Sequence, residues 1–328
     1  MSLLTVDDLK VIFPVRRGFL GRSSYEVRAV NGVTFVLEAG ETLGLVGESG
    51  SGKSTIGRAL LRLVPASGGT ICIDGKDITR EPGRVLDFRR DLQVIFQDPY
   101  SSLNPSMIIG DIIGEPLTIH HGMRGEAKRA RVAELLSQVG LSADQMERYP
   151  SEFSGGQRQR IAIARALSLS PRIIICDEAV SALDVSTQSQ VINLLQELKS
   201  RLGIAYLFIA HDLAVVRHIS DNIGVLYLGQ LMEQGPAKRV YDEPRHPYTR
   251  MLLQAVPVTD PARQKARKAE RRKIPARELP GPTNVPDGCP FHTRCPDVMD
   301  FCRTTKPASV PAPGGGEVAC HLYADAHS

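Results

Sequence analysis

The chain has 328 residues, of which 42% are hydrophobic and 23% are charged, and its formal net charge is +4 at pH 7. This length is enough for a large core and an appended second region, and so small a net charge gives no reason to expect a nucleic-acid partner. No apolar run approaches the roughly 18 to 20 residues that span a bilayer, and the acidic start at Asp7 and Asp8 is unlike a signal peptide, so we expect a cytosolic protein that is able to dock on a membrane protein.

The first part of the chain is predicted to form strands that lead into a glycine-rich turn. Strands are expected over 3–13 and 27–38, the second because its apolar residues alternate. After a turn at Gly40-Glu41, the apolar run 42–46 is typical of a buried strand. Apolar residues at helical spacing from Ser54 onward then predict a helix.

The segment between that strand and that helix, GESGSGKS at 47–54, fits the phosphate-binding pattern G-x-x-x-x-G-K-[ST] at every fixed position. Its glycines allow backbone conformations that turn successive amide hydrogens toward phosphate oxygens. Lys53 brings a positive charge to the β- and γ-phosphates, and Ser54 offers a hydroxyl to the accompanying magnesium ion. We therefore predict that the chain binds a nucleoside triphosphate. The predicted contacts are Gly47, Ser49, Gly50, Ser51, Gly52, Lys53, Ser54 and Thr55.

The next part of the chain changes from strands to helices. Strands are predicted at 70–73 and 92–96, and Gln97-Asp98-Pro99 stops the second one abruptly. From 104 to 149, charged and apolar residues recur at helical spacing. We interpret this segment as a helical insert in an α/β core.

A second anion-binding segment is predicted at Ser154-Gly155-Gly156-Gln157, directly before a run of apolar residues. A helix that starts in this way exposes amide hydrogens as the phosphate loop does. Taken alone, the same residues are also compatible with an ordinary helix cap.

Two carboxylates follow Arg172 and the apolar run 173–176, and that run is typical of a fully buried parallel strand. Asp177 and Glu178 lie at its carboxyl end, where ligands bind in open α/β sheets. Asp177 can hold magnesium through water, and Glu178 can orient an attacking water. A lone Asp-Glu pair would instead cap the next helix, predicted at 187–199, but a phosphate loop upstream favours the chemical role.

Two isolated side chains are weaker candidates. Tyr25 precedes the phosphate loop and either stacks on the nucleotide base or packs at a sheet margin. His211 follows the buried strand 204–210 and either reaches the γ-phosphate or is a structural hydrogen-bonding group. Strands at 223–228 and 230–233 then close this region.

The six cysteines fall into two groups. Cys72 and Cys176 stand alone in apolar surroundings and are expected to be small buried thiols. The other four lie in a tail, 280–322, that is rich in proline and glycine and can bury little by itself. In a reducing compartment they favour metal ligation over disulfides, although the spacing C-x5-C-x6-C-x17-C lacks the C-x2-C pair usual in zinc sites. An iron–sulfur cluster, zinc and free thiols remain open for Cys289, Cys295, Cys302 and Cys320.

These motifs, in this order and at this rough spacing, resemble the ABC ATPase family over residues 3 to about 240. Phe153 stands where the family usually has leucine, and Ala179-Val180-Ser181 replaces the commoner Pro-Thr-Ser. The resemblance implies an α/β fold: a P-loop ATPase core, residues 1–240, with a β-rich subdomain and a helical subdomain at about 100–165. Residues 241–328 would form a small cysteine-containing extension.

The resemblance also implies roles for individual residues. Glu178 would be the catalytic carboxylate, His211 the γ-phosphate contact, and Gln97 the link from magnesium and water to a transmembrane partner. Magnesium would be held by Ser54, Gln97 and Asp177. In this family two cassettes stack head to tail, and each ATP lies between the phosphate loop of one and the Ser154–Gln157 segment of the other.

Beyond residue 240, the run His246-Pro247-Tyr248-Thr249-Arg250 looks like the extension of ATP-binding subunits in dipeptide, oligopeptide and nickel importers. Members of that group carry a 4Fe-4S cluster at the cysteines. The resemblance implies a peripheral ATPase at the cytoplasmic face of the inner membrane that powers import of peptides, or of nickel or another small solute. Its partners would be a second ATPase subunit, for which the resemblance favours a distinct paralogue, two membrane-spanning permeases and an extracytoplasmic substrate-binding protein.

Two other classes remain as alternatives. A soluble ABC ATPase acting on nucleic acid typically carries long coiled coils, for which the interval from Lys53 to Ser154 is too short. A redox or metal sensor would be governed by the cysteine tail. The basic stretch 260–273 is explained by a solvated helix or linker, or by contact with anionic lipid.

Overall fold

The structure is a computed structural model that describes residues 2–17, 23–80, 85–255, 281 and 285–323, so that the basic stretch 260–273 lies outside the described residues. The chain divides into two compact units, and each is described by itself. We call them the helical unit and the phosphate-loop unit. The helical unit comprises Met1–Leu3, Leu37–Thr42 and Arg80–Ile209. The phosphate-loop unit comprises Leu4–Val36, Leu43–Thr79 and Ala210–Ser328.

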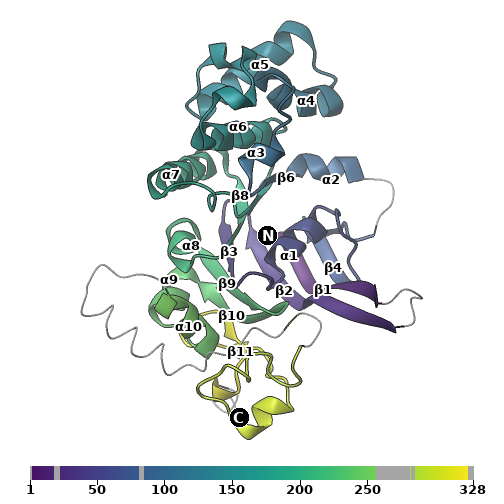
Figure 1. The fold of residues 1–328 in the computed structure, drawn as a ribbon, viewed down its shortest axis with the longest axis vertical. Helices are drawn as coiled ribbons and strands as arrows, with labels where there is room; N and C mark the ends of the chain where they lie inside the picture. The colour runs from purple at the N-terminus through teal and green to yellow at the C-terminus, as the bar shows by residue number, and fades with distance from the viewer. Residues whose placement is uncertain (1, 18–22, 81–84, 256–280, 282–284, 324–328) are drawn as a thin grey trace. The chain divides into compact units, whose positions relative to one another are not determined.

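The phosphate-loop unit begins with an antiparallel sheet in the order β2-β1-β4-β5 (Figure 1). The predicted strands at 3–13, 27–38 and 70–73 are confirmed, and the first two are longer than expected. Strand β1 pairs with β4 from Leu4↔Ile73 onward, and the register shifts between Asp7 and Lys10. The strands are β1 (Ser2–Arg17), β2 (Ser23–Glu38), β4 (Gly68–Ile73) and β5 (Lys76–Asp77).

The strand that leads into the phosphate loop belongs to a second sheet. Within this unit the order is β11-β12-β10-β9-β3. Strand β3 (Thr42–Val46) is buried along its whole length, as an apolar run predicts, and pairs in parallel with β9 (Asn222–Tyr227). The antiparallel strands are β10 (Gln230–Pro236), β11 (Val310–Pro311) and β12 (Glu317–Val318). The C-terminal tail therefore adds strands to this sheet.

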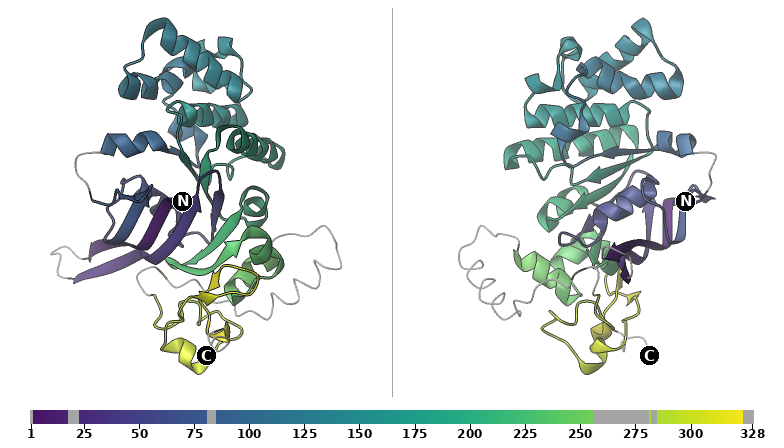
Figure 2. Two further views of the ribbon diagram at one scale, coloured as in Figure 1. Left: turned by 180° about the vertical axis from the view of Figure 1, so that it is seen from behind. Right: turned by 45° about the vertical axis from the view of Figure 1, so that its right-hand side comes forward.

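Helices of the same unit follow the strands. The bounds are α1 (Lys53–Leu60), α8 (Leu213–Ile219), α9 (Ala237–Asp242), α10 (Pro247–Ala255) and the 3-10 helix η3 (Asp300–Arg303). The views in Figures 1 and 2 agree that the C-terminal segment lies beside α9 and α10.

The helical unit combines three parallel strands with a group of helices. Strand β7 (Ile173–Asp177) lies between β6 (Leu92–Ile95) and β8 (Ala205–Ala210), with Ile95↔Cys176 and Asp177↔Ile209 in register. Helices α4, α5 and α6 pack on one another (Figures 1 and 2). The helices are α2 (Val85–Asp91), α3 (Pro99–Ser102), α4 (Ile109–His121), α5 (Gly125–Gln138), η1 (Ala143–Glu147), η2 (Pro150–Glu152), α6 (Gly155–Leu167) and α7 (Val185–Leu202).

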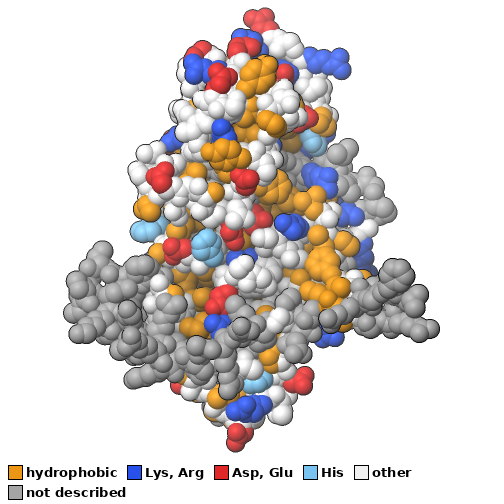
Figure 3. Space-filling model, viewed as in Figure 1, with side chains coloured by type: hydrophobic (Ala, Val, Ile, Leu, Met, Phe, Trp, Pro, Cys, Tyr) orange, Lys and Arg blue, Asp and Glu red, His pale blue; other side chains and the backbone are white. Residues whose placement is uncertain are grey.

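The helical character predicted for 104–149 is confirmed. Most of its apolar positions are buried, among them Ile112 on α4 and Leu136 on α5, whereas Ile119 is exposed. Charged side chains of both signs are interspersed on the visible face of these helices (Figure 3), and Lys128 Nζ lies 3.0 Å from Asp111 Oδ1. Such exposed pairs contribute little stability. Among the described residues, no helix is both long enough and apolar enough to cross a bilayer.

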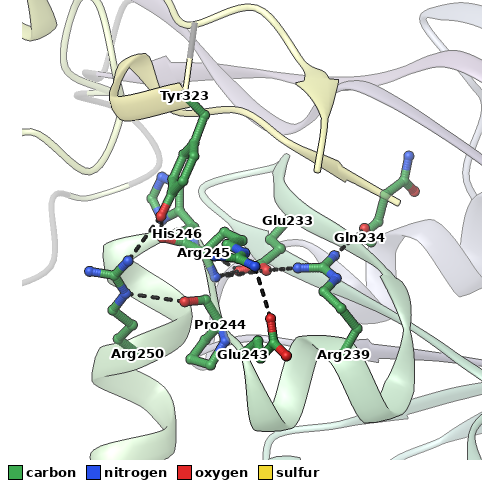
Figure 4. Close-up of polar contacts among 9 residues, drawn as sticks. All are labelled: Glu233, Gln234, Arg239, Glu243, Pro244, Arg245, His246, Arg250 and Tyr323. Atoms are coloured by element: carbon green, nitrogen blue, oxygen red, sulfur yellow. Dashed lines mark hydrogen bonds and ion pairs between the residues drawn. The ribbon is translucent and has the colours of Figure 1, made fainter. Parts of the chain in front are cut away.

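A buried carboxylate organises the start of the C-terminal extension (Figure 4). The side chain of Glu233 is fully buried and forms an ion pair with Arg239. It also accepts hydrogen bonds from the backbone N–H groups of Arg245 at 3.0 Å and His246 at 2.9 Å. The Tyr323 hydroxyl donates to the Arg245 carbonyl at 3.1 Å, which ties the end of the described chain to the same network. Because breaking a buried pair leaves an uncompensated charge, this network is costly to disrupt.

His246 is fully buried beside that network. Its Nδ1 accepts the Tyr248 backbone N–H at 3.0 Å, which fixes that nitrogen as unprotonated. Burial disfavours the charged ring and lowers the pKa of His246 to about 3.

We expect this histidine to make stability depend on pH. Its pKa is lower when folded (about 3) than the roughly 6.5 of an unfolded histidine, so below pH 6.5 the unfolded chain binds a proton that the folded chain does not. Stability is therefore lost as the pH falls from 6.5 toward 3, by up to roughly 1.4 kcal/mol per pH unit.

Urea unfolding at a series of pH values checks this. His246→Asn keeps an acceptor but does not titrate, so its curve should be flatter below pH 6.5, while His218→Asn, at an exposed position, should follow the wild type. Parallel curves for wild type and His246→Asn would contradict the expectation.

Candidate functional site

The glycine-rich loop connects β3 to α1, as the sequence predicts. It closes at Gly52, which has φ 105° and precedes the first residue of the helix. A Cβ atom on Gly52 would lie 2.2 Å from the Ala29 carbonyl oxygen, and one on Gly47 would lie 2.1 Å from that of Leu226. Close backbone contacts therefore exclude a side chain at both positions, and at Gly52 the left-handed conformation favours glycine as well.

Lys53 is buried within this loop. Its ammonium donates to the carbonyls of Gly47 at 2.8 Å and Glu48 at 3.0 Å, and to the Ser51 hydroxyl at 3.3 Å. The loop thus holds a positive charge against its own backbone, and the dipole of α1 adds to the same positive end. The donor set fits the phosphates of a nucleotide.

Two residues that the sequence analysis did not assign also contact the loop. Tyr248 Oη accepts the Glu48 N–H at 2.9 Å, and Arg294 forms a bidentate pair with the Glu48 carboxylate. The motif around His246 and Tyr248 indicates an extension of the ATPase core. No spacing in the sequence, however, predicts that Tyr248 or Arg294 contacts the phosphate loop.

The isolated candidates Tyr25 and His211 belong to the same unit. Tyr25 lies on β2 with an exposed ring, which favours the stacking alternative over packing. His211 is exposed between β8 and α8. Asp212, the next residue, caps α8 by accepting the Ala214 N–H at 2.8 Å. The nucleotide roles of Tyr25 and His211 stay predictions.

In the helical unit, the sheet brings a second set of candidates to one edge. Gln97 follows β6, Asp177 is the last residue of β7 and Glu178 comes directly after it, so all three lie at the carboxyl ends of adjacent parallel strands. Glu178 has φ 50°, and its N–H donates to the Ile209 carbonyl at 2.9 Å. Gln97 is exposed, and the adjacent Asp98 caps α3 by accepting the Tyr100 N–H at 2.8 Å. This amide hydrogen bond lowers the pKa of Asp98.

The Ser154–Gln157 segment starts α6 in a capping box. Ser154 Oγ accepts the Gln157 N–H at 3.3 Å, and the Gln157 side chain accepts the Ser154 N–H at 3.0 Å. A Cβ atom on Gly156 would lie 2.3 Å from Thr187 Cγ2, so this glycine lets α6 approach α7 closely. The cap alternative is confirmed, while the anion-binding role stays a prediction.

The predicted site residues therefore form two sets. The phosphate-loop residues, with Tyr25 and His211, belong to one unit, and Gln97, Asp177, Glu178 and the Ser154–Gln157 segment belong to the other.

The four tail cysteines gather in the phosphate-loop unit. They are free thiols; Cys289, Cys302 and Cys320 are buried, and Cys295 is partly buried. Burial raises the pKa of Cys295 to about 12 and that of Cys320 to about 11. Within the described ranges, however, no three or more His, Cys, Asp or Glu side chains are arranged to hold a metal ion. The structure thus lends no support to a cluster or zinc. The other two cysteines are also free: Cys176 is buried, as expected, but Cys72 is only partly so.

Two protein-family models match the chain. One is described as ABC transporter and matches residues 30–181, and the other as oligopeptide/dipeptide transporter, C-terminal region, and matches 232–302. The chain is 49% identical to the oligopeptide transport ATP-binding protein AppF of Bacillus subtilis, over 98% of each chain. It is 58% identical to the glutathione import ATP-binding protein GsiA of Escherichia coli, over 80% of this chain and 42% of that protein.

Among solved structures, it resembles the dimeric post-hydrolysis state of the ATP-binding cassette MJ0796 bound to ADP and Pi. That likeness has a TM-score of 0.62 and 28% identity, and it covers 71% of this chain and 98% of the other. These matches confirm the fold class and the family resemblance that the motifs predicted.

We expect Gly52→Ala to weaken nucleotide binding much more than Gly50→Ala. Both glycines have positive φ, but a Cβ at Gly50 would meet nothing within 4 Å, whereas one at Gly52 would collide with the Ala29 carbonyl. The two variants share the cost of a side chain in a left-handed conformation, roughly 1–2 kcal/mol, so their difference isolates the collision. Titration with a fluorescent ATP analogue should show a loss of affinity above about tenfold for Gly52→Ala only. Equal losses would contradict this account of the loop.

Proposed function

This chain belongs to the ABC transporter family, in its oligopeptide and dipeptide group, and from that premise we propose that it hydrolyses ATP to power the import of dipeptides, oligopeptides or a related small solute. The observation that carries the proposal is the phosphate loop. Close backbone contacts exclude a side chain at Gly47 and Gly52, and the buried Lys53 ammonium donates to the Gly47 and Glu48 carbonyls. An ATPase subunit does not itself contact the cargo, so nickel or another small solute remains the alternative.

The chemistry assigns each predicted residue a task. Lys53 and the loop amides bind the phosphates, and Ser54, Gln97 and Asp177 would hold magnesium. Bound magnesium would neutralise charge that develops on the phosphate oxygens. Glu178 positions and polarises the attacking water, and His211 contacts the γ-phosphate.

We further propose that Ser154, Gly155, Gly156 and Gln157 complete the ATP site of a second cassette. The start of α6 supports this because Ser154 is exposed and the first amides of a helix favour anions. The solved cassette MJ0796 is described as dimeric with bound ADP and Pi. A triphosphate held between two cassettes would favour their paired state, and its hydrolysis would release it.

The remaining partners follow from the same group. We propose that the second cassette is a paralogue, that two permease subunits span the membrane, and that an extracytoplasmic protein delivers the substrate. The chain would then act at the cytoplasmic face of the inner membrane. The match to AppF, an oligopeptide transport protein, supports this assignment over a nucleic-acid ATPase.

Replacing the catalytic carboxylate should separate binding from turnover. In Glu178→Gln the amide still occupies the site but no longer polarises water, so phosphate release should fall by about 100-fold or more. The affinity for a fluorescent ATP analogue should stay within a few-fold of wild type. Glu126→Gln, at an exposed position on α5, is the matched control and should change neither. Undiminished hydrolysis in Glu178→Gln would remove this residue from its role.

As a second and separate point, we propose that Cys289, Cys295, Cys302 and Cys320 bind a 4Fe-4S cluster, with zinc as the alternative. Support comes from four free thiols in one tail; burial first, and then repulsion from neighbouring cysteine thiolates, raises the pKa of Cys295 and that of Cys320. The described side chains are not arranged as a ligand set, so the group is given no part in the mechanism.

Anaerobic purification followed by iron and sulfide analysis tests the cysteine proposal. We expect about four irons per chain, lost in Cys302→Ser but retained in Cys72→Ser, which lies outside the tail. A colourless, iron-free wild type with intact ATPase activity would overturn the proposal, and zinc in its place would select the alternative.

A further inference from the structure

Glu48, the residue after the first loop glycine, is held at three of its groups: the carbonyl, the N–H and the carboxylate. Its carbonyl accepts from Lys53 Nζ at 3.0 Å, its N–H donates to Tyr248 Oη at 2.9 Å, and its carboxylate binds Arg294. Arg294 Nη1 lies 2.7 Å from Oε2 and Nη2 lies 3.0 Å from Oε1, the two-point geometry that a planar guanidinium makes with a carboxylate. Residues of the C-terminal extension bind two of these three groups, the N–H and the carboxylate.

The pair lies in a sheltered, aromatic setting. The Arg294 side chain is 12% exposed and that of Glu48 is 23% exposed. Tyr227, Tyr248 and Phe291 pack together beside it, with ring centroids 4.7 to 5.4 Å apart. The hydrogen bonds to Glu48 are the largest cause that raises the pKa of Arg294. A fork-shaped charge pair in such surroundings is stronger and better oriented than an exposed one.

The geometry connects this pair to phosphate binding. The Lys53 ammonium rests on the Gly47 and Glu48 carbonyls, so the orientation of the peptide units around Glu48 determines where the charge sits. The Glu48 N–H is engaged by Tyr248 and is therefore turned to the extension. The loop itself is rich in glycine, which keeps little shape without outside support.

The extension does not need this pair to stay attached. Strand β12 pairs with β10, and the Ala319 N–H donates to the Met232 carbonyl at 2.9 Å. Glu233 separately binds the backbone of Arg245 and His246. Removing Arg294 should therefore leave the fold in place and act on the loop.

We propose that Arg294 is a positioning residue for nucleotide binding. By binding the Glu48 carboxylate it holds the phosphate loop in the conformation that binds phosphates. Through this contact the C-terminal extension increases the affinity for ATP. This inference rests on the proposed ATPase function. Preorganisation of this kind lowers the cost of ordering the loop when phosphates bind. It acts before the chemical step, so it affects KM and not kcat.

The test compares Arg294→Met, Arg294→Lys and Glu48→Gln in the full-length chain. Arg294→Met should raise KM for MgATP, and the dissociation constant of a fluorescent ATP analogue, by about tenfold with kcat within twofold. Lysine keeps the charge but lacks the fork, so Arg294→Lys should recover only part of the affinity. Glu48→Gln should resemble Arg294→Met, and the double variant should be no worse than either single one.

Arg250→Met is the matched control because Arg250 lies in the same extension, on the Tyr323 side, and has no contact with the loop among its described interactions. It should leave KM unchanged. Thermal unfolding without nucleotide separates loss of fold from loss of positioning, and the isosteric Glu48→Gln answers the question if Arg294→Met does not fold. Wild-type affinity in both Arg294→Met and Glu48→Gln would overturn the inference while leaving the ATPase assignment intact. A wild-type chain that neither binds nor hydrolyses ATP would instead refute the proposed function.

Discussion

The phosphate loop closes where the Gly52 backbone passes within atomic contact of the Ala29 carbonyl, and the rest of the phosphate-loop unit depends on that approach. Strand β2 supplies the carbonyl, and the Gly229 N–H donates to the Ser51 carbonyl at 2.8 Å from the other side. The Asn31 N–H in turn donates to Gly229 at 2.8 Å. The antiparallel strands thus support a loop in which three of the eight residues are glycine, although none of these strands carries a catalytic group.

The C-terminal extension also supports the phosphate loop, so it is part of the nucleotide-binding structure and not a separate appendage. It joins the same sheet as the phosphate-loop strand, through β12 on β10, and reaches the loop through Tyr248 and Arg294. A segment that buries little by itself gains order from a sheet edge and a buried carboxylate at Glu233. In return it holds Glu48 in the loop, through its N–H and its carboxylate. The extension and the ATP-binding residues are therefore best treated as one cooperative structure.

Local patterns accounted for much of this molecule, and contacts distant in sequence account for what they missed. The phosphate loop, the buried strand β3 and the two faces of the α4–α5 region each have a period or a fixed spacing that the sequence displays. The Glu48–Arg294 pair joins residues 246 positions apart, and no spacing rule records it. Strands β11 and β12 have two residues each, too short to show alternation in a proline-rich tail. The sequence likewise gives the positions of the four tail cysteines along the chain, but it does not predict how their sulfur atoms are arranged in space.

The start of α6 shows that two interpretations of one motif need not compete. A serine hydroxyl has one donor and two acceptor positions. The cap uses an acceptor, since Ser154 Oγ receives the Gln157 N–H, so the cap does not consume the O–H that a phosphate oxygen would accept. The same cap fixes the rotamer of the exposed hydroxyl and holds the Gly155 and Gly156 amides in the first helical turn, where the helix dipole favours an anion. If this segment binds the ATP of a second cassette, the cap is an advantage and not a competing role. It orients the hydroxyl and amide donors of the segment before the second cassette binds.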